Sequence, residues 1–190
     1  MIIGEHSVIR AAEPDDAYSL IQLYDSETPR SFLLGPAREV MTPNRDELRE
    51  ILTRRDLVTG TFFVVEDKQG EIQGSAVFRG AKLESEFAEI VLALGRDEAY
   101  QSPLAHEVFL YLRRVAFVDK KLNKIVSHCL STETASRAFL LSHGFRSDGV
   151  QRDMTYARGR YYDLEAFSLF RRDVLEELEA ELDEPATATS

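Results

Sequence analysis

Three kinds of side chain in this sequence have the chemistry of proton transfer, nucleophilic attack or metal binding. Glu89 lies between apolar neighbours, where a carboxylate can serve as a base, although a strand glutamate also commonly faces solvent. Cys129 is the single cysteine, and a lone cysteine is more often a small buried hydrophobic residue than a nucleophile. The histidines His106, His128 and His143 lack metal-ligand spacing with any cysteine or carboxylate cluster. We therefore predict no metal site.

The elements that position these residues begin with a strand and two helices. Residues 8–10 predict a short strand. Acidic residues within 13–16 suit a helix N-terminus, and apolar residues spaced by three and four predict an amphipathic helix from there to Tyr24. Residues 26–45 contain three prolines and predict an irregular loop or a short helix, and a loop of this length often lines a site. A helix is expected from about Asp46 to Arg55.

The remainder of the chain predicts a sheet with interspersed helices. Ser102 can cap a helix whose first residue is Pro103, because proline at that position loses no helical hydrogen bond. Gly144 stands where the last of these helices should end. The predicted strands are 61–66, 72–78, 86–94, 124–130, 150–156 and 162–170, and the predicted helices are 102–116 and 131–141.

Composition and charge restrict the location and the partners of the protein. The chain has 190 residues and 44% hydrophobic content, which predicts one domain over residues 1–173, followed by an acidic helix and flexible tail at 174–190. We predict a cytoplasmic protein for three reasons. The chain has a single cysteine, residues 1–6 show no leader pattern, and the sequence lacks the ~20 consecutive apolar residues that span a bilayer. The net charge of −10 disfavours nucleic acid, and it either attracts a cationic partner or simply favours solubility.

Several short motifs occur in a distinctive order between about residues 7 and 173. They are Ile9-Arg10 leading to Asp15-Asp16; Ala88-Glu89-Ile90; Glu107 with Tyr111-Leu112 and Ala116-Phe117; Ser136-Arg137-Ala138 leading to Gly144-Phe145; and Gly149–Asp153 with Gly159–Asp163. This order resembles the GNAT superfamily of acetyltransferases, and within it the bacterial ribosomal-protein N-terminal acetyltransferases. The resemblance implies the GNAT fold, an α/β (α+β) domain with a mixed, mostly antiparallel twisted sheet of about seven strands flanked by about four helices.

The resemblance also implies that acetyl-CoA, as co-substrate, binds along residues 90–94 and the helix that follows. In this family the strand splays from its neighbour and the pantetheine arm pairs with the exposed backbone. Amides at the next helix N-terminus then hold the pyrophosphate. The predicted contacts are Leu92, Ala93, Leu94, Gln101, Ser102, Leu104, Ala105, His106, Cys129 and Arg137.

The phosphate-binding loop departs from the family pattern. The family sequence is Gln or Arg, two residues, Gly, one residue, then Gly or Ala, and here Tyr100, Pro103 and Ala105 occupy those positions. An alignment anchored on Tyr100-Gln101 instead leaves the loop one residue short. Pro103 has no amide proton, whereas the amides of residues 104–106 remain at the helix N-terminus. The resemblance therefore implies weakened cofactor binding.

The same resemblance assigns roles to individual side chains. Glu89 corresponds to a carboxylate thought to act through water as the base, and Ser136 to a serine that protonates the leaving thiolate; Ser136 could equally bond to its own helix backbone. Glu133 replaces the usual Asn and brings an anion near the cofactor. Leu140 replaces the catalytic Tyr of other branches, which excludes a tyrosine acid from that helix. The residues predicted to lie on the acceptor side are Phe32, Phe78, Tyr156, Tyr161 and Tyr162. Alternatively, the three tyrosines are ordinary surface aromatic residues of the final hairpin.

Three functions are compatible with this sequence. The first is an N-acetyltransferase that moves an acetyl group from acetyl-CoA to a primary amine, either a protein N-terminus or a small amine, by direct attack. The second is a non-catalytic GNAT-fold binding or regulatory protein with weakened CoA binding. The third is an acyltransferase that takes another acyl donor, such as a carrier-protein arm. Acetyl-CoA and an amine acceptor are the expected partners, with a possible homodimer and with neither nucleic acid nor membrane.

Overall fold

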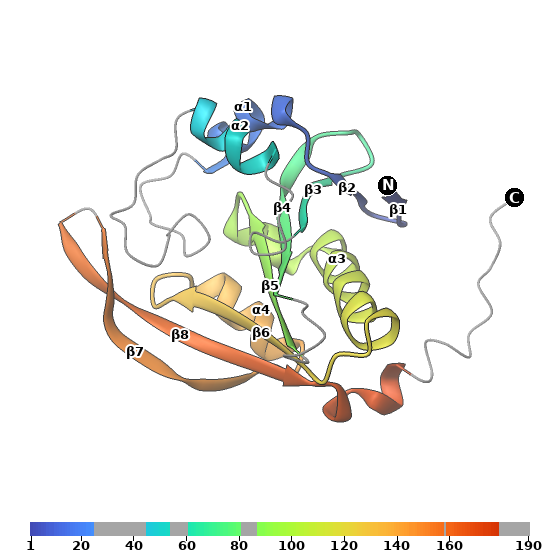
Figure 1. The fold of residues 1–190 in the computed structure, drawn as a ribbon, viewed down its shortest axis with the longest axis vertical. Helices are drawn as coiled ribbons and strands as arrows, with labels where there is room; N and C mark the ends of the chain where they lie inside the picture. The colour runs from blue at the N-terminus through green and yellow to red at the C-terminus, as the bar shows by residue number, and fades with distance from the viewer. Residues whose placement is uncertain (25–44, 54–60, 81–86, 158, 179–190) are drawn as a thin grey trace, which may run out of the picture.

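One twisted sheet of eight strands forms the frame of the described chain (Figure 1). The computed structural model describes residues 1–24, 45–53, 61–80, 87–157 and 159–178. The strand order is β1-β2-β3-β4-β5-β6-β8-β7, and every neighbouring pair is antiparallel except β5 with β6. The bounds are β1 Ile2–Ile3, β2 Val8–Ala11, β3 Thr61–Glu66, β4 Ile72–Arg79, β5 Phe87–Leu94, β6 Lys124–Leu130, β7 Arg146–Ala157 and β8 Arg160–Phe170.

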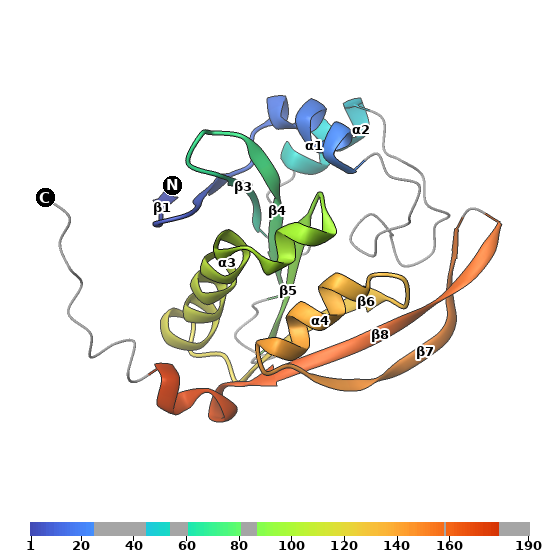
Figure 2. The same cartoon turned by 180° about the vertical axis from the view of Figure 1, so that it is seen from behind.

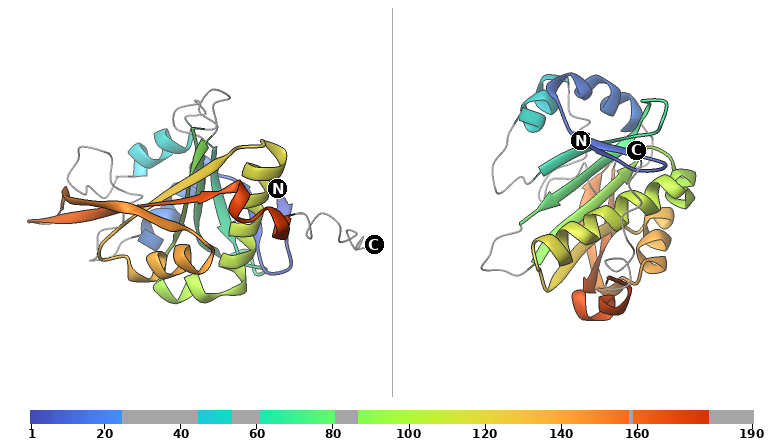
Figure 3. Two further views of the ribbon diagram at one scale, coloured as in Figure 1. Left: turned by 90° about the horizontal axis from the view of Figure 1, so that it is seen from below. Right: turned by 90° about the vertical axis from the view of Figure 1, so that its right-hand side faces the viewer.

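Helices cover both faces of this sheet. They are α1 Ala17–Tyr24, α2 Arg45–Thr53, α3 Pro103–Arg114 and α4 Thr134–Ser142. α3 and α4 lie on one face (Figures 2 and 3). Between them the rings of Phe109 and Phe139 meet edge to face with their centroids 5.9 Å apart. α1 and α2 pack on the opposite face through Leu20 and Leu52. No helix within the described ranges is both long and apolar enough to cross a bilayer.

Short helical turns complete the connections. Within the part of the chain that the structure describes, three are 3₁₀ helices and one is a π-helical turn that continues α3: η1 Pro14–Asp16, η3 Asp97–Gln101, η5 Arg171–Asp173 and the π turn η4 Val115–Asp119. The turn η3 is the one that matters for the site, because it joins the end of β5 to the start of α3.

The predicted fold class is confirmed: the sheet is mixed and mostly antiparallel, and four α-helices flank it. Ser102 caps α3 as predicted, since its hydroxyl accepts from the amide of Ala105 at 3.2 Å. The largest differences from prediction concern β1, β7 and α4. β1, with two residues, is too short to show a strand pattern; β7 begins at Arg146 rather than at residue 150; and α4 begins at Thr134 rather than at 131. The predicted loop over 26–45 lies almost entirely outside the described residues.

The first residues of the predicted tail belong to the core. Val174 and Leu178 are buried in the main hydrophobic cluster beneath α3. Glu177 forms an ion pair at 2.7 Å with Arg113, whose side chain is almost fully buried. The packed domain therefore continues to at least residue 178, beyond the boundary at residue 173 that the sequence suggested.

Candidate active site

The sheet opens between β5 and β6. These strands pair in parallel only over the first three residues of each, from Phe87 with Lys124 to Glu89 with Val126. Beyond that point they diverge, as Figures 1 and 2 show. The opening contains a small pocket with about 20 Å³ of free space, which is little more than one water molecule needs, because side chains fill most of the gap. Its lining residues are Ile90, Val91, Leu92, Ala93, Tyr100, Phe109, Ser127, His128, Glu133, Ser136, Phe139, Leu140 and Phe145.

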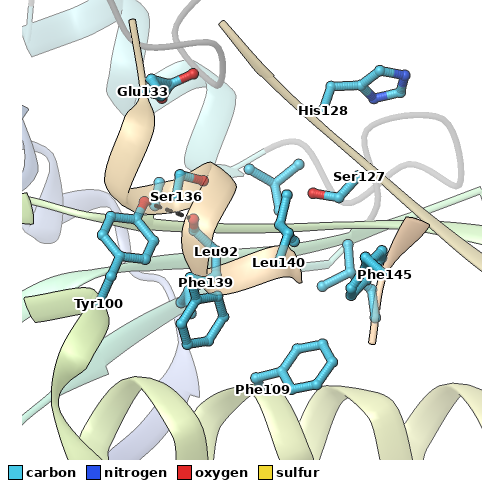
Figure 4. Close-up of a pocket in the computed structure, with 13 residues that line it drawn as sticks. Leu92, Tyr100, Phe109, Ser127, His128, Glu133, Ser136, Phe139, Leu140 and Phe145 are labelled. Carbon is cyan, nitrogen blue, oxygen red and sulfur yellow. Dashed lines mark hydrogen bonds between the residues drawn. The ribbon is translucent and has the colours of Figure 1, made fainter. Parts of the chain in front are cut away.

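Tyr100 fills part of this opening. Its side chain is 6% exposed and reaches from η3 back to β5, where its hydroxyl donates to the carbonyl of Leu92 at 3.0 Å (Figure 4). The same hydroxyl accepts from the amide of Leu94 at 3.3 Å, and the ring meets Phe139 edge to face with centroids 5.7 Å apart. Two backbone groups of β5 that the diverging β6 does not reach are therefore satisfied by one side chain.

The opposite face of the sheet carries a carboxylate and an imidazole side by side. Ala88 and Ile90 on β5, and Ile125 on β6, point into the main core under α3 and α4. Because successive strand residues point to opposite faces, Glu89 and His128 project from the other side. Their closest atoms, Oε1 of Glu89 and Nδ1 of His128, are 3.3 Å apart. The pair stands at the point where the two strands part.

Charged groups on neighbouring strands surround this pair. Arg79, opposite Glu89 in the β4–β5 ladder, brings Nη1 to 3.7 Å from the Glu89 carboxylate. The hydrogen bond from His128, opposed by partial burial and assisted by the charge of Arg79, lowers the pKa of Glu89. Asp148 on β7 is near enough to His128 for their charges to interact. With Glu89 ionised, Nδ1 of His128 carries the shared proton and Nε2 can accept one.

The first turn of α4 contributes two polar side chains to the pocket. Ser136 is half-buried and lines it. Glu133 is the N-cap residue of α4 and is 8% exposed. Its carboxylate accepts from the amide of Leu130 at 2.7 Å, and its own amide donates to the Leu130 carbonyl at 2.9 Å. The anion that the sequence placed near the cofactor therefore closes the turn between β6 and α4.

The N-terminus of α3 offers fewer donors than the sequence suggested. The amide of Ala105 donates to the Ser102 hydroxyl, and the amide of His106 reaches the Ser102 carbonyl at 3.4 Å. The ring of His106 is exposed and forms a hydrogen bond with His143, with Nδ1 and Nε2 2.8 Å apart. Of the amides expected to remain at the helix N-terminus, those of Ala105 and His106 are therefore bonded to Ser102.

A family model described as "Acetyltransferase (GNAT) domain" matches residues 7–146 of this chain. The chain belongs to the GNAT family of acetyltransferases. A related protein of Bacillus licheniformis, named "Uncharacterized N-acetyltransferase p20", is 29% identical over 174 residues, which cover 89% of this chain and 95% of that protein. GNAT acetyltransferases use acetyl-CoA as co-substrate, so this protein is an acyl-CoA N-acyltransferase.

Solved acetyltransferase structures share the fold of this GNAT domain. A crystal structure of a probable acetyltransferase superimposes with a TM-score of 0.73 at 25% identity, covering 91% of this chain and 97% of that one. A GCN5-related N-acetyltransferase from Brucella melitensis gives 0.71 at 19% identity, over 98% of this chain and 87% of that one. A dodecameric structure of spermidine N-acetyltransferase from Vibrio cholerae gives a TM-score of 0.69 at 20% identity, covering 92% of this chain and 99% of that one. At identities below one quarter the likeness concerns the fold alone.

Several predicted acetyl-CoA contacts of this GNAT domain do not face the pocket. Cys129 is 1% exposed and lies in the main core, where burial and the charges of Glu133 and Glu165 raise the pKa of its thiol to about 12. It therefore corresponds to the alternative interpretation of a buried hydrophobic residue. Arg137 is exposed and its guanidinium donates to Glu165 at 2.7 Å. The remaining contacts divide as follows: Leu92 and Ala93 line the pocket, Leu94 bonds to Tyr100, Gln101 is exposed, and Leu104 and Ala105 are buried.

The predicted acceptor-side residues are scattered. Phe78 is buried in the main core under α3, because it pairs with Ile90 and shares its face; it is not on the face of Glu89. Tyr162 is buried beside Leu130 in a small separate cluster, and the Tyr156 and Tyr161 rings are exposed and contact each other at 5.1 Å. Phe32 lies outside the described residues.

Sequence reasoning missed the two most suggestive contacts of the site. His128 was considered only as a metal ligand, although an alternating strand facing Glu89 would have placed it on the same face. Tyr100 was considered only as a departure from the family loop, and no local signal predicts that its hydroxyl returns to β5.

Proposed function

We propose that this GNAT acetyltransferase moves the acetyl group of acetyl-CoA to a primary amine by direct attack on the thioester. The observation that carries the proposal is the contact between Glu89 and His128 at the point where β5 and β6 part. A primary amine is mostly protonated at neutral pH, so it must lose a proton before it attacks. A carboxylate–imidazole pair beside the opening is suited to receive that proton.

In this proposal His128 and Glu89 have different tasks. Nδ1 of His128 donates to Glu89, so Nε2 is the imidazole nitrogen that takes the proton of the amine. The charge of Glu89 stabilises the imidazolium that forms and fixes the ring tautomer. The lowered pKa of Glu89 makes the carboxylate alone a weak base at neutral pH, so we assign the proton of the amine to the imidazole. Glu89 is therefore a positioning residue, and His128 is the proton acceptor.

Ser136 is proposed as the proton donor for the departing thiolate. Bound acetyl-CoA supplies the activated acyl group. Ser136 and His128 both line the pocket, Ser136 from α4 and His128 from β6 with its side chain toward the other face of the sheet. An acid and a base on opposite sides of the opening suit a reaction in which the amine and the thioester approach from opposite faces.

The residues around the opening fit the arm of acetyl-CoA better than its phosphates. The edge of β5 from Leu92 to Leu94 faces a pocket with mainly apolar lining, which suits an extended chain carrying amides. At the start of α3 the amides of Ala105 and His106 are engaged in the cap. Exposed acidic residues in η3 add negative charge near the same helix end. We therefore infer that acetyl-CoA binds more weakly than a full phosphate loop would allow.

The acceptor is a protein N-terminus or a small amine. The motif order that resembles the ribosomal-protein acetyltransferases favours the first, and the net charge of −10 favours a small cationic amine. Assembly into a homodimer stays a prediction.

A direct assay tests the function. The protein is incubated with acetyl-CoA and, separately, with peptides bearing a free N-terminus and with spermidine, and the products are weighed by mass spectrometry. Acetylation of one class, lost in His128→Gln, supports the proposal. Absence of acetyl-CoA binding at millimolar concentration in calorimetry refutes it.

A further inference from the structure

The two β5 groups bound by Tyr100 have the geometry of a missing strand. In a parallel ladder, the carbonyl of one residue and the amide two positions later both bond to a single residue of the neighbouring strand. Leu92 and Leu94 flank Ala93 in this way, and β6 has left the ladder five residues before Leu94, at Glu89. A hydroxyl both donates and accepts, so the hydroxyl of Tyr100 takes the place of that absent residue.

We propose that Tyr100 is a removable substitute for a strand and controls entry of the acyl donor. This inference rests on the proposed function, because it assumes that acetyl-CoA binds in the opening. The arm of acetyl-CoA carries secondary amides, which have the same donor and acceptor as a strand residue. The arm and the hydroxyl of Tyr100 therefore compete for Leu92 and Leu94, and donor binding requires the tyrosine side chain to leave.

The local structure allows this movement without disturbing α3. Tyr100 belongs to η3, whose bonds run over three residues, from the amide of Ala99 to the carbonyl of Arg96 and from Ser102 to Ala99. Short 3₁₀ segments have weaker hydrogen-bond geometry than α-helices and rearrange more easily. Rotation of the Tyr100 side chain alone leaves the cap of α3 in place, where the Ser102 hydroxyl accepts from the amide of Ala105 and donates to the carbonyl of Ala99 in η3.

The competition has a measurable consequence. Tyr100→Phe keeps the ring that packs on Phe139 but removes the hydroxyl, so the β5 groups of the free protein lose their partner. We expect calorimetry to give an acetyl-CoA Kd about tenfold lower than in the wild type, which corresponds to a binding free energy more favourable by about 1.4 kcal/mol. Tyr111→Phe is the matched control, since Tyr111 is a partly buried tyrosine of α3 outside the pocket lining, and its Kd should be unchanged.

A second measurement uses the wild-type protein. Tyr100 is buried in the free protein, so tetranitromethane should nitrate it slowly. If the side chain leaves the opening when acetyl-CoA binds, acetyl-CoA should raise the rate at which Tyr100 is nitrated. Peptide mass spectrometry measures this rate.

The outcomes separate this inference from the proposed function. The inference is overturned if Tyr100→Phe binds acetyl-CoA no more tightly than the wild type, or if acetyl-CoA leaves the slow nitration of Tyr100 unchanged. In either case, binding of acetyl-CoA by the wild type still supports the proposed function. No binding by the wild type and by both variants overturns the proposed function together with the inference.

Discussion

Replacing Glu89 by glutamine should lower the rate of acetyl transfer while leaving the fold intact. The carboxylate lies 3.3 Å from Nδ1 of His128. At an effective dielectric constant of about 20, Coulomb's law gives about 5 kcal/mol for a carboxylate and an imidazolium at this distance. The side chains are 27% and 33% exposed, so solvent screens part of this attraction. Taking half, about 2.5 kcal/mol, predicts a loss of about 60-fold in kcat/KM.

A double-mutant cycle tests the reasoning. Release of free thiol is followed with the amine that the product assay identifies. In the His128→Gln background, Glu89→Gln should change kcat/KM by no more than about twofold, because no imidazolium remains to be stabilised. Equal losses in both backgrounds would refute the division of roles.

The pH dependence supplies an independent readout. In Glu89→Gln the acidic limb of the kcat/KM profile should move to lower pH, because the imidazolium loses one neighbouring charge while Arg79 and Asp148 remain. A merely structural role of Glu89 would leave that limb in place. Glu71→Gln, which alters an exposed carboxylate in the β3–β4 turn, is the control and should behave as the wild type.

Three further predictions concern other parts of the molecule. Ser136→Ala should lower kcat by at least about tenfold with an unchanged acetyl-CoA Kd, as measured by steady-state kinetics and calorimetry. Cys129 should resist thiol reagents at pH 8 in the folded protein, since its thiol has a pKa of about 12, and should react fully in guanidinium chloride; fast labelling of native protein would contradict this. Asp16→Asn should cost about 2 kcal/mol of unfolding free energy at pH 7, because Asp16 accepts two guanidinium hydrogen bonds from Arg10 and one from the amide of Glu13. Burial alone would raise the pKa of Asp16, but those hydrogen bonds and the charge of Arg10 lower it. The stability difference between wild type and variant is therefore present above the ordinary aspartate pKa, and it should vanish as the pH falls through the pKa of Asp16 in the folded protein. Denaturation curves at a series of pH values measure this.

Local signals explain what the sequence predicted well. Ser102 and Pro103 determine the start of α3 through one cap bond and one missing amide, and both effects involve residues within three positions. The strands β3, β4, β5 and β6 follow from alternating β-branched and aromatic residues. Such features need no knowledge of the rest of the chain.

The candidate site depends on contacts that local patterns do not contain. Glu89 and His128 are 39 residues apart and meet only because β5 pairs with β6 in one register. Phe78 turned away from the acceptor face for a similar reason, since its pairing with Ile90 places both in the main core. The interior position of Cys129 likewise follows from which face of β6 meets α4.

The short parallel pairing has a mechanical consequence for the whole sheet. β1 to β5 come from the first part of the chain and β6 to β8 from the second, and the two groups share a ladder of only three residues per strand. Side-chain packing across the gap, such as that of Phe109 on α3 against Phe139 on α4, joins the two groups where backbone bonding stops. A molecule bound in the gap contacts both groups of strands. Its binding therefore restricts the motion of one group relative to the other, and the sheet becomes more rigid when the ligand is bound.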